Sequence, residues 1–143
     1  MKHRFILTPT EEDIKEIGEA FCLRDAVVAL DASDVQEVLE NAENAIVLYG
    51  KASGANRCAD AIEDAVLHCC AVAQDYDLFT ADNLLLQIDC PKSAPMLMRE
   101  FEAIETFTEM FHQNITSKFG FAEKENITEM RVMLLAANLK KKQ

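Results

Sequence analysis

A strand–helix–strand arrangement between residues 44 and 89 constrains the fold of this chain more than any other feature. Two short apolar segments, NAIVLYGKA at 44–52 and ADNLLLQID at 81–89, have the length and composition of strands. Between them, from about residue 56 to residue 73, apolar side chains recur at helical spacing. They are Cys58, Ala61, Ile62, Ala65, Val66 and Cys69. Because a helix with such a stripe must bury it against another element, this region predicts an α/β fold.

The C-terminal sequence continues the same alternation. The segment 90–93 (Cys-Pro-Lys-Ser) is expected to end the second strand, and Pro95 is expected in the first turn of a helix that reaches His112. Two closing strands follow at 115–122 and 128–138, and we expect them to form an antiparallel pair. The sequence therefore predicts an α/β (α+β) domain with a four-stranded mixed sheet and two helices on one face.

The first 30 residues are expected to form an N-terminal extension. KHRFILT (2–8) predicts a short strand, and Thr8-Pro9-Thr10, followed by acidic residues, is a start signal for a helix that ends near residue 24. A second helix is expected to begin between Asp31 and Asp34. The expected organisation is an extension over 1–30, a domain over 31–139 and a basic tail over 140–143.

Composition excludes several classes of function. The net charge of −11 disfavours nucleic acid as a partner, because phosphate binding needs clustered lysine and arginine. No signal peptide or membrane-spanning stretch is evident, so we expect no membrane partner. The cysteines number five and form no CxxC pair, which predicts a reduced, cytoplasmic protein. Neither a cofactor nor a metal is expected, since His68, Cys69 and Cys70 would point apart on a helix.

Asp31 and Asp34 are the most distinctive polar residues of the chain. Their spacing places both carboxylates on one face at the start of a helix, where negative charge is favoured. One interpretation is that they cap the helix, as aspartate commonly does. The other is that they present two carboxylates to a partner, and both roles can coexist.

Read in order, these segments resemble the C-terminal domain of FtsZ, the bacterial tubulin-like division GTPase. VVALDASDV (27–35) resembles the family's synergy loop, in which two apolar residues precede N-x-D-x-x-D-V, although Ala29 replaces the asparagine. NLLLQI, LMREFEAIET and the closing pair ITSKFGFA and EMRVMLLAANL resemble the strands and helix that follow. Two further departures are Cys90-Pro91-Lys92, where the family has N-I-T-G-G-x-D, and Ala137-Asn138, where it has Thr-Gly. The resemblance covers about residues 14–139.

The resemblance implies an interface at Ala29, Asp31, Ser33 and Asp34, where the family's aspartates enter a neighbouring subunit's nucleotide site. The four glycines of this sequence are isolated, so no phosphate loop can form and we expect no enzymatic activity of the chain on its own. We therefore expect an interaction or assembly module linked to cell division, with itself or a tubulin/FtsZ-like protein as partner.

Two alternatives remain open. Asp31 and Asp34 could stimulate GTP hydrolysis by a partner in trans, since orienting the attacking water is a large part of phosphoryl transfer. The chain could instead be a homo-oligomeric domain that binds a small ligand between subunits, because a fold does not determine a function.

Overall fold

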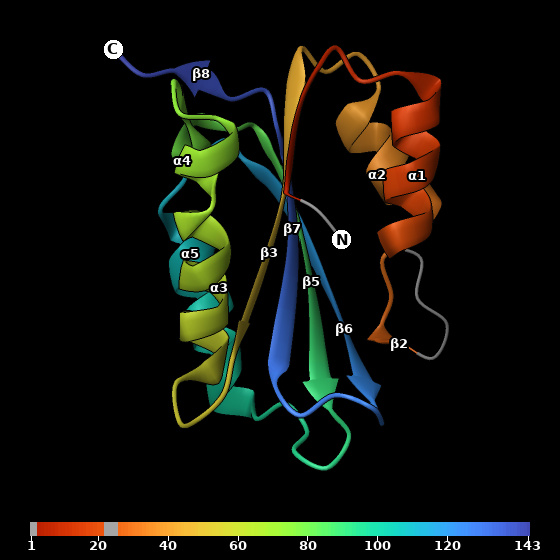
Figure 1. Cartoon of the computed structure of the whole chain (residues 1–143), viewed down its shortest axis with the longest axis vertical. Coiled ribbons are helices and arrows are strands. Elements are labelled where there is room, and N and C mark those ends of the chain that lie inside the picture. The colour runs from red at the N-terminus through yellow and green to blue at the C-terminus, as the bar shows by residue number, and fades with distance from the viewer. Residues whose placement is uncertain (1–2, 22–25) are drawn as a thin grey trace.

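The computed structural model describes residues 3–21 and 26–143. Three layers are visible in Figure 1, with a central sheet between two sets of helices. The elements, in chain order, are β1 (Arg4–Leu7), α1 (Glu11–Phe21), β2 (Ala26–Val28), α2 (Ala32–Leu39), β3 (Asn44–Ala52), α3 (Arg57–Leu67), α4 (Cys69–Val72), β4 (Tyr76–Asp77), η1 (Leu78–Thr80), β5 (Asn83–Pro91), η2 (Met98–Glu100), α5 (Phe101–Glu109), β6 (Thr116–Lys124), β7 (Met130–Ala137) and β8 (Lys140–Lys141). The expected end of the first helix, near residue 24, lies outside the described residues.

The main sheet has six strands in the order β1-β3-β7-β5-β6-β2, which corrects the expectation of four. Its four central strands are the four that the sequence predicts, and β1 and β2 extend its two edges. β1 pairs antiparallel with β3, and β2 pairs antiparallel with the end of β6. The short strand expected at 2–8 is therefore present at 4–7. β2 was not expected, because its three residues are too few to show a strand pattern.

The two closing strands do not pair with each other, which corrects the expected antiparallel pair. β5 lies between them and pairs parallel with β6 and antiparallel with β7. β7 is inserted between β3 and β5 and pairs with β3 along its whole length. Seven of its eight residues are buried, so both of its faces need cover and it belongs at the centre of the sheet. β6 begins with four exposed residues and lies nearer the edge.

Helices cover both faces of the sheet. α3 and α5 share one face, as the sequence predicts, and α1 and α2, which the sequence predicts without placing them, cover the other (Figure 1). Successive residues of β5 point to opposite faces, as the pleat of a strand requires. Leu84 and Leu86 therefore enter the core beneath α3 and α5, and Leu85 enters the core beneath α1 and α2.

Most strand and helix ends differ from the sequence expectation by one to three residues, and three differences change the local structure. The helix expected over 56–73 is divided at His68 into α3 and α4. β5 continues through Pro91, which the end of a strand tolerates because few ladder bonds are lost there. Pro95 does not lie in a helix, since α5 begins at Phe101 after the short 3-10 turn η2. No described helix has the length and apolar character needed to cross a membrane.

Candidate functional site

The first turn of α2 holds the two aspartates that the sequence singles out. Asp31 is the N-cap residue, and one of its carboxylate oxygens accepts hydrogen bonds from the backbone N–H groups of Ser33, at 2.9 Å, and Asp34, at 3.1 Å. The Asp34 carboxylate accepts the backbone N–H of Asp31 at 2.9 Å. This reciprocal arrangement is a capping box, and it satisfies N–H groups that a helix start otherwise leaves unpaired.

Lys118, on β6, contacts the same turn from a distant part of the sequence. Its ammonium donates to the second oxygen of Asp34 at 2.8 Å and lies 3.7 Å from a carboxylate oxygen of Glu37. The hydrogen bond to Asp34 raises the pKa of Lys118. Both oxygens of Asp34 are therefore engaged within the chain. Within the described part of the chain, the second oxygen of Asp31 has no hydrogen-bond donor, and that residue is exposed.

The structure brings Asp31, Ser33 and Asp34 together and leaves Ala29 exposed just before them. Sequence reasoning missed Lys118, because it lies 84 residues from Asp34 and no motif links the two. The capping role of the aspartates is directly visible. Their expected role at an interface stays a prediction.

Removing the cap at Asp31 should weaken the fold in a pH-dependent way. The Ser33 hydroxyl and the backbone N–H of Asp34 donate to the carboxylate and hold the pKa of Asp31 below its usual 3.8. A carboxylate with a depressed pKa stabilises the fold above its unfolded-state pKa, and this stabilisation is lost as the pH falls through the folded-state value. We expect Asp31→Asn, which keeps the acceptor but not the charge, to melt below the wild type at neutral pH, and Asp31→Ala to melt lower still.

Circular dichroism melts from about pH 7 down to about pH 2 test this, because the series must cross the ordinary aspartate pKa of about 3.9 and continue below it. The gap between the wild type and Asp31→Asn should close as the pH falls below 3.8. A gap of constant size would contradict the capping account.

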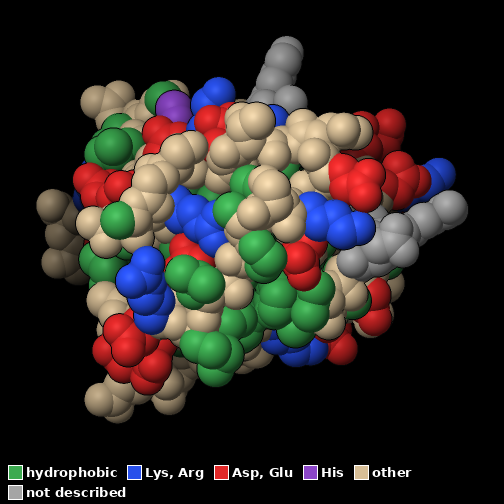
Figure 2. Space-filling view, turned by 90° about the horizontal axis from the view of Figure 1, so that it is seen from below, with side chains coloured by type: hydrophobic (Ala, Val, Ile, Leu, Met, Phe, Trp, Pro, Cys, Tyr) green, Lys and Arg blue, Asp and Glu red, His purple; other side chains and the backbone are tan. Residues whose placement is uncertain are grey.

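Two segments that lie toward the lower end of the molecule in Figure 1 carry large apolar side chains that are exposed. Val27 and Val28, on β2, are 56% and 40% exposed, and Leu97 and Met98, at the start of η2, are 48% and 83% exposed. Figure 2 shows apolar side chains gathered across the middle of this end, with lysine and arginine side chains beside them. We call these four residues the lower face. The aspartate cap follows β2 directly in sequence.

Gly120 allows β2 to lie close to β6. A Cβ at this position would be 2.7 Å from the Val28 carbonyl oxygen and 3.1 Å from the Leu30 side chain. Because Gly120 has no side chain, the backbone of β2 at Val28 can lie directly against β6. The β2 half of the lower face is thus held by its packing against β6.

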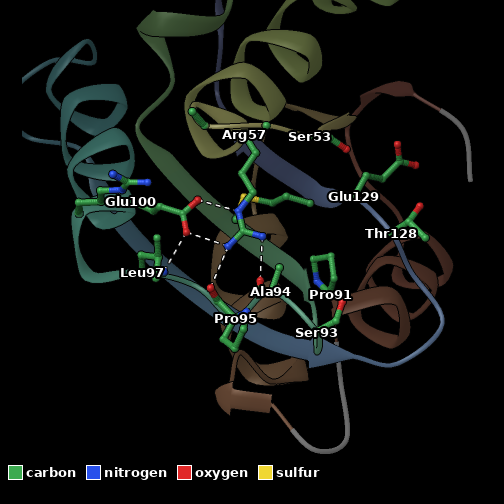
Figure 3. Close-up of a pocket in the computed structure, with 14 residues that line it drawn as sticks. Ser53, Arg57, Pro91, Ser93, Ala94, Pro95, Leu97, Glu100, Thr128 and Glu129 are labelled. Atoms are coloured by element: carbon green, nitrogen blue, oxygen red, sulfur yellow. Dashed lines mark hydrogen bonds and ion pairs between the residues drawn. The ribbon is translucent and has the colours of Figure 1, made fainter.

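A buried ion pair fixes the other half of the lower face. Arg57, at the start of α3, donates two hydrogen bonds of 2.8 Å to Glu100, and two further N–H groups donate to the carbonyl oxygens of Ala94, at 2.8 Å, and Pro95, at 2.9 Å (Figure 3). Glu100 also accepts the backbone N–H of Leu97 at 2.8 Å. The pair lowers the pKa of Glu100 and raises that of Arg57. It therefore holds the segment that carries Leu97 and Met98 against α3.

The pocket around this ion pair has a volume of about 380 Å³ and is drawn in Figure 3. It lies between the turn at 53–55, the segment 91–100 and residues 128–130. Four of the five N–H donors of the Arg57 guanidinium are bound by protein acceptors, so its charge is largely committed to the fold. Arg99 is the second cation in the pocket lining. Across residues 3–21 and 26–143, no group of three or more His, Cys, Asp or Glu side chains could hold a metal ion.

Comparison with solved structures defines the class of fold. The chain superposes on the empty FtsZ dimer of M. jannaschii with a TM-score of 0.70 and 22% identity, over 88% of this chain and 39% of that one. It also superposes on TubZ of Bacillus thuringiensis serovar israelensis, solved as a GTPγS-form protofilament, with a TM-score of 0.64 and 14% identity, over 90% of this chain and 34% of that one. The fold is that of a domain found in FtsZ and TubZ.

Sequence comparison points to one of these two proteins. The chain is 27% identical to the cell division protein FtsZ of Neisseria meningitidis over 128 residues, which is 88% of this chain and 32% of that protein. FtsZ of Neisseria gonorrhoeae matches to the same extent. No protein-family model matches the chain. In sequence and in fold the chain is thus related to FtsZ, as its motifs indicated, and it spans about a third of the length of these relatives.

Proposed function

We propose that this FtsZ-related chain is an interaction module that docks through its lower face onto a tubulin-like protein or a second copy, without chemistry of its own. The observation that carries the proposal is the exposure of Val27, Val28, Leu97 and Met98 at one end of the fold. Exposed apolar side chains that gather on one surface are typical of a docking site, whereas scattered ones are not. Relatives that were solved as a dimer and as a protofilament support the proposal.

The geometry of the aspartates favours docking over catalysis. A pair of carboxylates that orients water needs oxygens directed at the reacting centre. Asp34 commits both of its oxygens to the cap and to Lys118. The second oxygen of Asp31 accepts no hydrogen bond within the described residues and remains available to a partner. Stimulation of a partner's GTP hydrolysis is therefore the second candidate function, and it would depend on Asp31 alone. A ligand site between subunits would be favoured if oligomers formed to bury an uncovered face of the sheet. α1 and α2 already cover that face, so the ligand-binding alternative has less support than the other two.

Co-sedimentation with Neisseria FtsZ polymers tests the proposal. A module that binds one end of a filament subunit should pellet with the polymer and lower the polymer mass as its concentration rises. If the chain remained in the supernatant and the polymer mass did not change, docking would be ruled out.

Phosphate release, measured in the same samples, separates the two candidates. Docking alone predicts equal release per pelleted FtsZ for the wild type and for Asp31→Asn. Stimulation in trans predicts higher release with the wild type and a loss of that increase with Asp31→Asn.

A further inference from the structure

A second apolar surface lies away from the lower face, between α3 and α5. These helices lie side by side on one face of the sheet (Figure 1), and a groove of about 580 Å³ runs along them. Its apolar lining includes Ile62 and Val66 from α3 and Ala103 and Phe107 from α5. At one end of the groove, Leu67 is 68% exposed and Met110 is 57% exposed. An apolar groove between two helices is a surface that can accept a third helix.

The charges along this groove are mostly negative. Glu63 lines it from α3 and Glu102 from α5, and both are exposed. Neither forms an ion pair within the described part of the chain. Arg99 is the cation among the lining residues, at the α5 N-terminal end. The potential at the groove is therefore suited to a cationic occupant.

We propose that the groove binds an amphipathic helix of a partner protein, with apolar residues on one side and lysine or arginine along its flanks. The apolar side would cover Val66, Leu67 and Met110, and the basic flanks would face Glu63 and Glu102. Pairing of this groove with the same groove of a second copy is disfavoured, because Glu63 and Glu102 of the two copies would face each other and repel. This inference is independent of the proposed docking at the lower face.

Two synthetic peptides probe the groove directly. Each is about 18 residues long, because shorter helices are marginal in water. Both carry leucine at i, i+3, i+4 and i+7, one with lysine on the flanks and the other with glutamate at the same positions. Fluorescence anisotropy should show the basic peptide binding at least about tenfold more tightly than the acidic one.

Two double variants with equal net charge locate the binding. Glu63→Lys with Glu102→Lys changes the groove and should reverse the preference between the two peptides. Glu105→Lys with Glu109→Lys changes exposed residues of α5 that do not line the groove, and should leave the preference in place. Comparing the two double variants shows whether the peptide preference depends on the charges in the groove or on the net charge of the whole chain.

The inference would be overturned if the basic peptide did not bind, or if both peptides bound equally well. It would also be overturned if the two double variants had equal effects, or if Met98→Glu on the lower face abolished peptide binding.

Sedimentation equilibrium gives one more test. A concentration-dependent dimer that Met110→Glu abolishes would show that a second copy occupies the groove.

Discussion

Gly50→Ala is expected to destabilise the fold by about 3 kcal/mol or more, the upper range for overpacking a well-packed core. Gly50 lies in β3 directly beneath α3. A Cβ there would lie 2.1 Å from the carbonyl oxygen of Ala61 and 2.5 Å from the backbone nitrogen of Ala65. Both atoms belong to the helix backbone, so no side-chain rotation can relieve the overlap. α3 would have to move away from the sheet.

Gly18→Ala provides the matched control. Gly18 is also buried, inside α1, but a Cβ at this position would meet Ala32 at an ordinary contact distance of 3.7 Å. Alanine is favoured over glycine inside a helix by about 1 kcal/mol, so this variant should be as stable as the wild type or more stable. Urea denaturation of the three proteins measures both effects. Similar midpoints for Gly50→Ala and the wild type would contradict the close packing of α3 on β3.

Arg57→Ala is expected to cost about 3–5 kcal/mol, the range for removing one partner of a buried ion pair. The Arg57 side chain is 11% exposed and that of Glu100 is 7% exposed, so little water reaches the carboxylate left behind. The variant also removes the donors to the carbonyl oxygens of Ala94 and Pro95. Because these contacts tie the segment 94–100 to α3, we expect that segment to lose its fixed position as well.

The exposed pair between Arg4 and Glu16 is the control for this experiment. Their side chains are 37% and 58% exposed, and exposed ion pairs contribute about 0–1 kcal/mol. Glu16→Ala should therefore change the free energy of unfolding by less than about 1 kcal/mol. Hydrogen exchange on Arg57→Ala should show faster exchange at the Leu97 backbone N–H. Equal free-energy costs for Arg57→Ala and Glu16→Ala would contradict the role given to the buried pair.

The sequence predicted the centre of the fold well, because the pattern of apolar residues is local. β3 was expected at 44–52 and spans those same residues, and the stripe from Cys58 to Ala65 does face the sheet. Strand order was harder to predict, since pairing depends on contacts between distant segments. β7 follows β6 in the chain, yet its two buried faces place it between β3 and β5.

The candidate site was predictable only in its local part. Asp31 and Asp34 are three residues apart, so their capping box follows from helix geometry. The pairing of Arg57 with Glu100 spans 43 residues and that of Lys118 with Asp34 spans 84, and neither leaves a pattern in the sequence. The lower face escaped prediction for the same reason, because Val28 and Met98 belong to segments far apart in the sequence, and only folding brings β2 and η2 to the same end of the molecule.

The central claim is that the lower face is the docking surface, and a pair of matched variants in the FtsZ co-sedimentation experiment tests it most directly. Met98 on the lower face is 83% exposed and Met110 beside the α3–α5 groove is 57% exposed, so glutamate at either position should leave the fold intact. We predict that Met98→Glu abolishes pelleting with the polymer and that Met110→Glu pellets like the wild type. Unchanged pelleting of Met98→Glu, with loss of pelleting in Met110→Glu, would contradict the account.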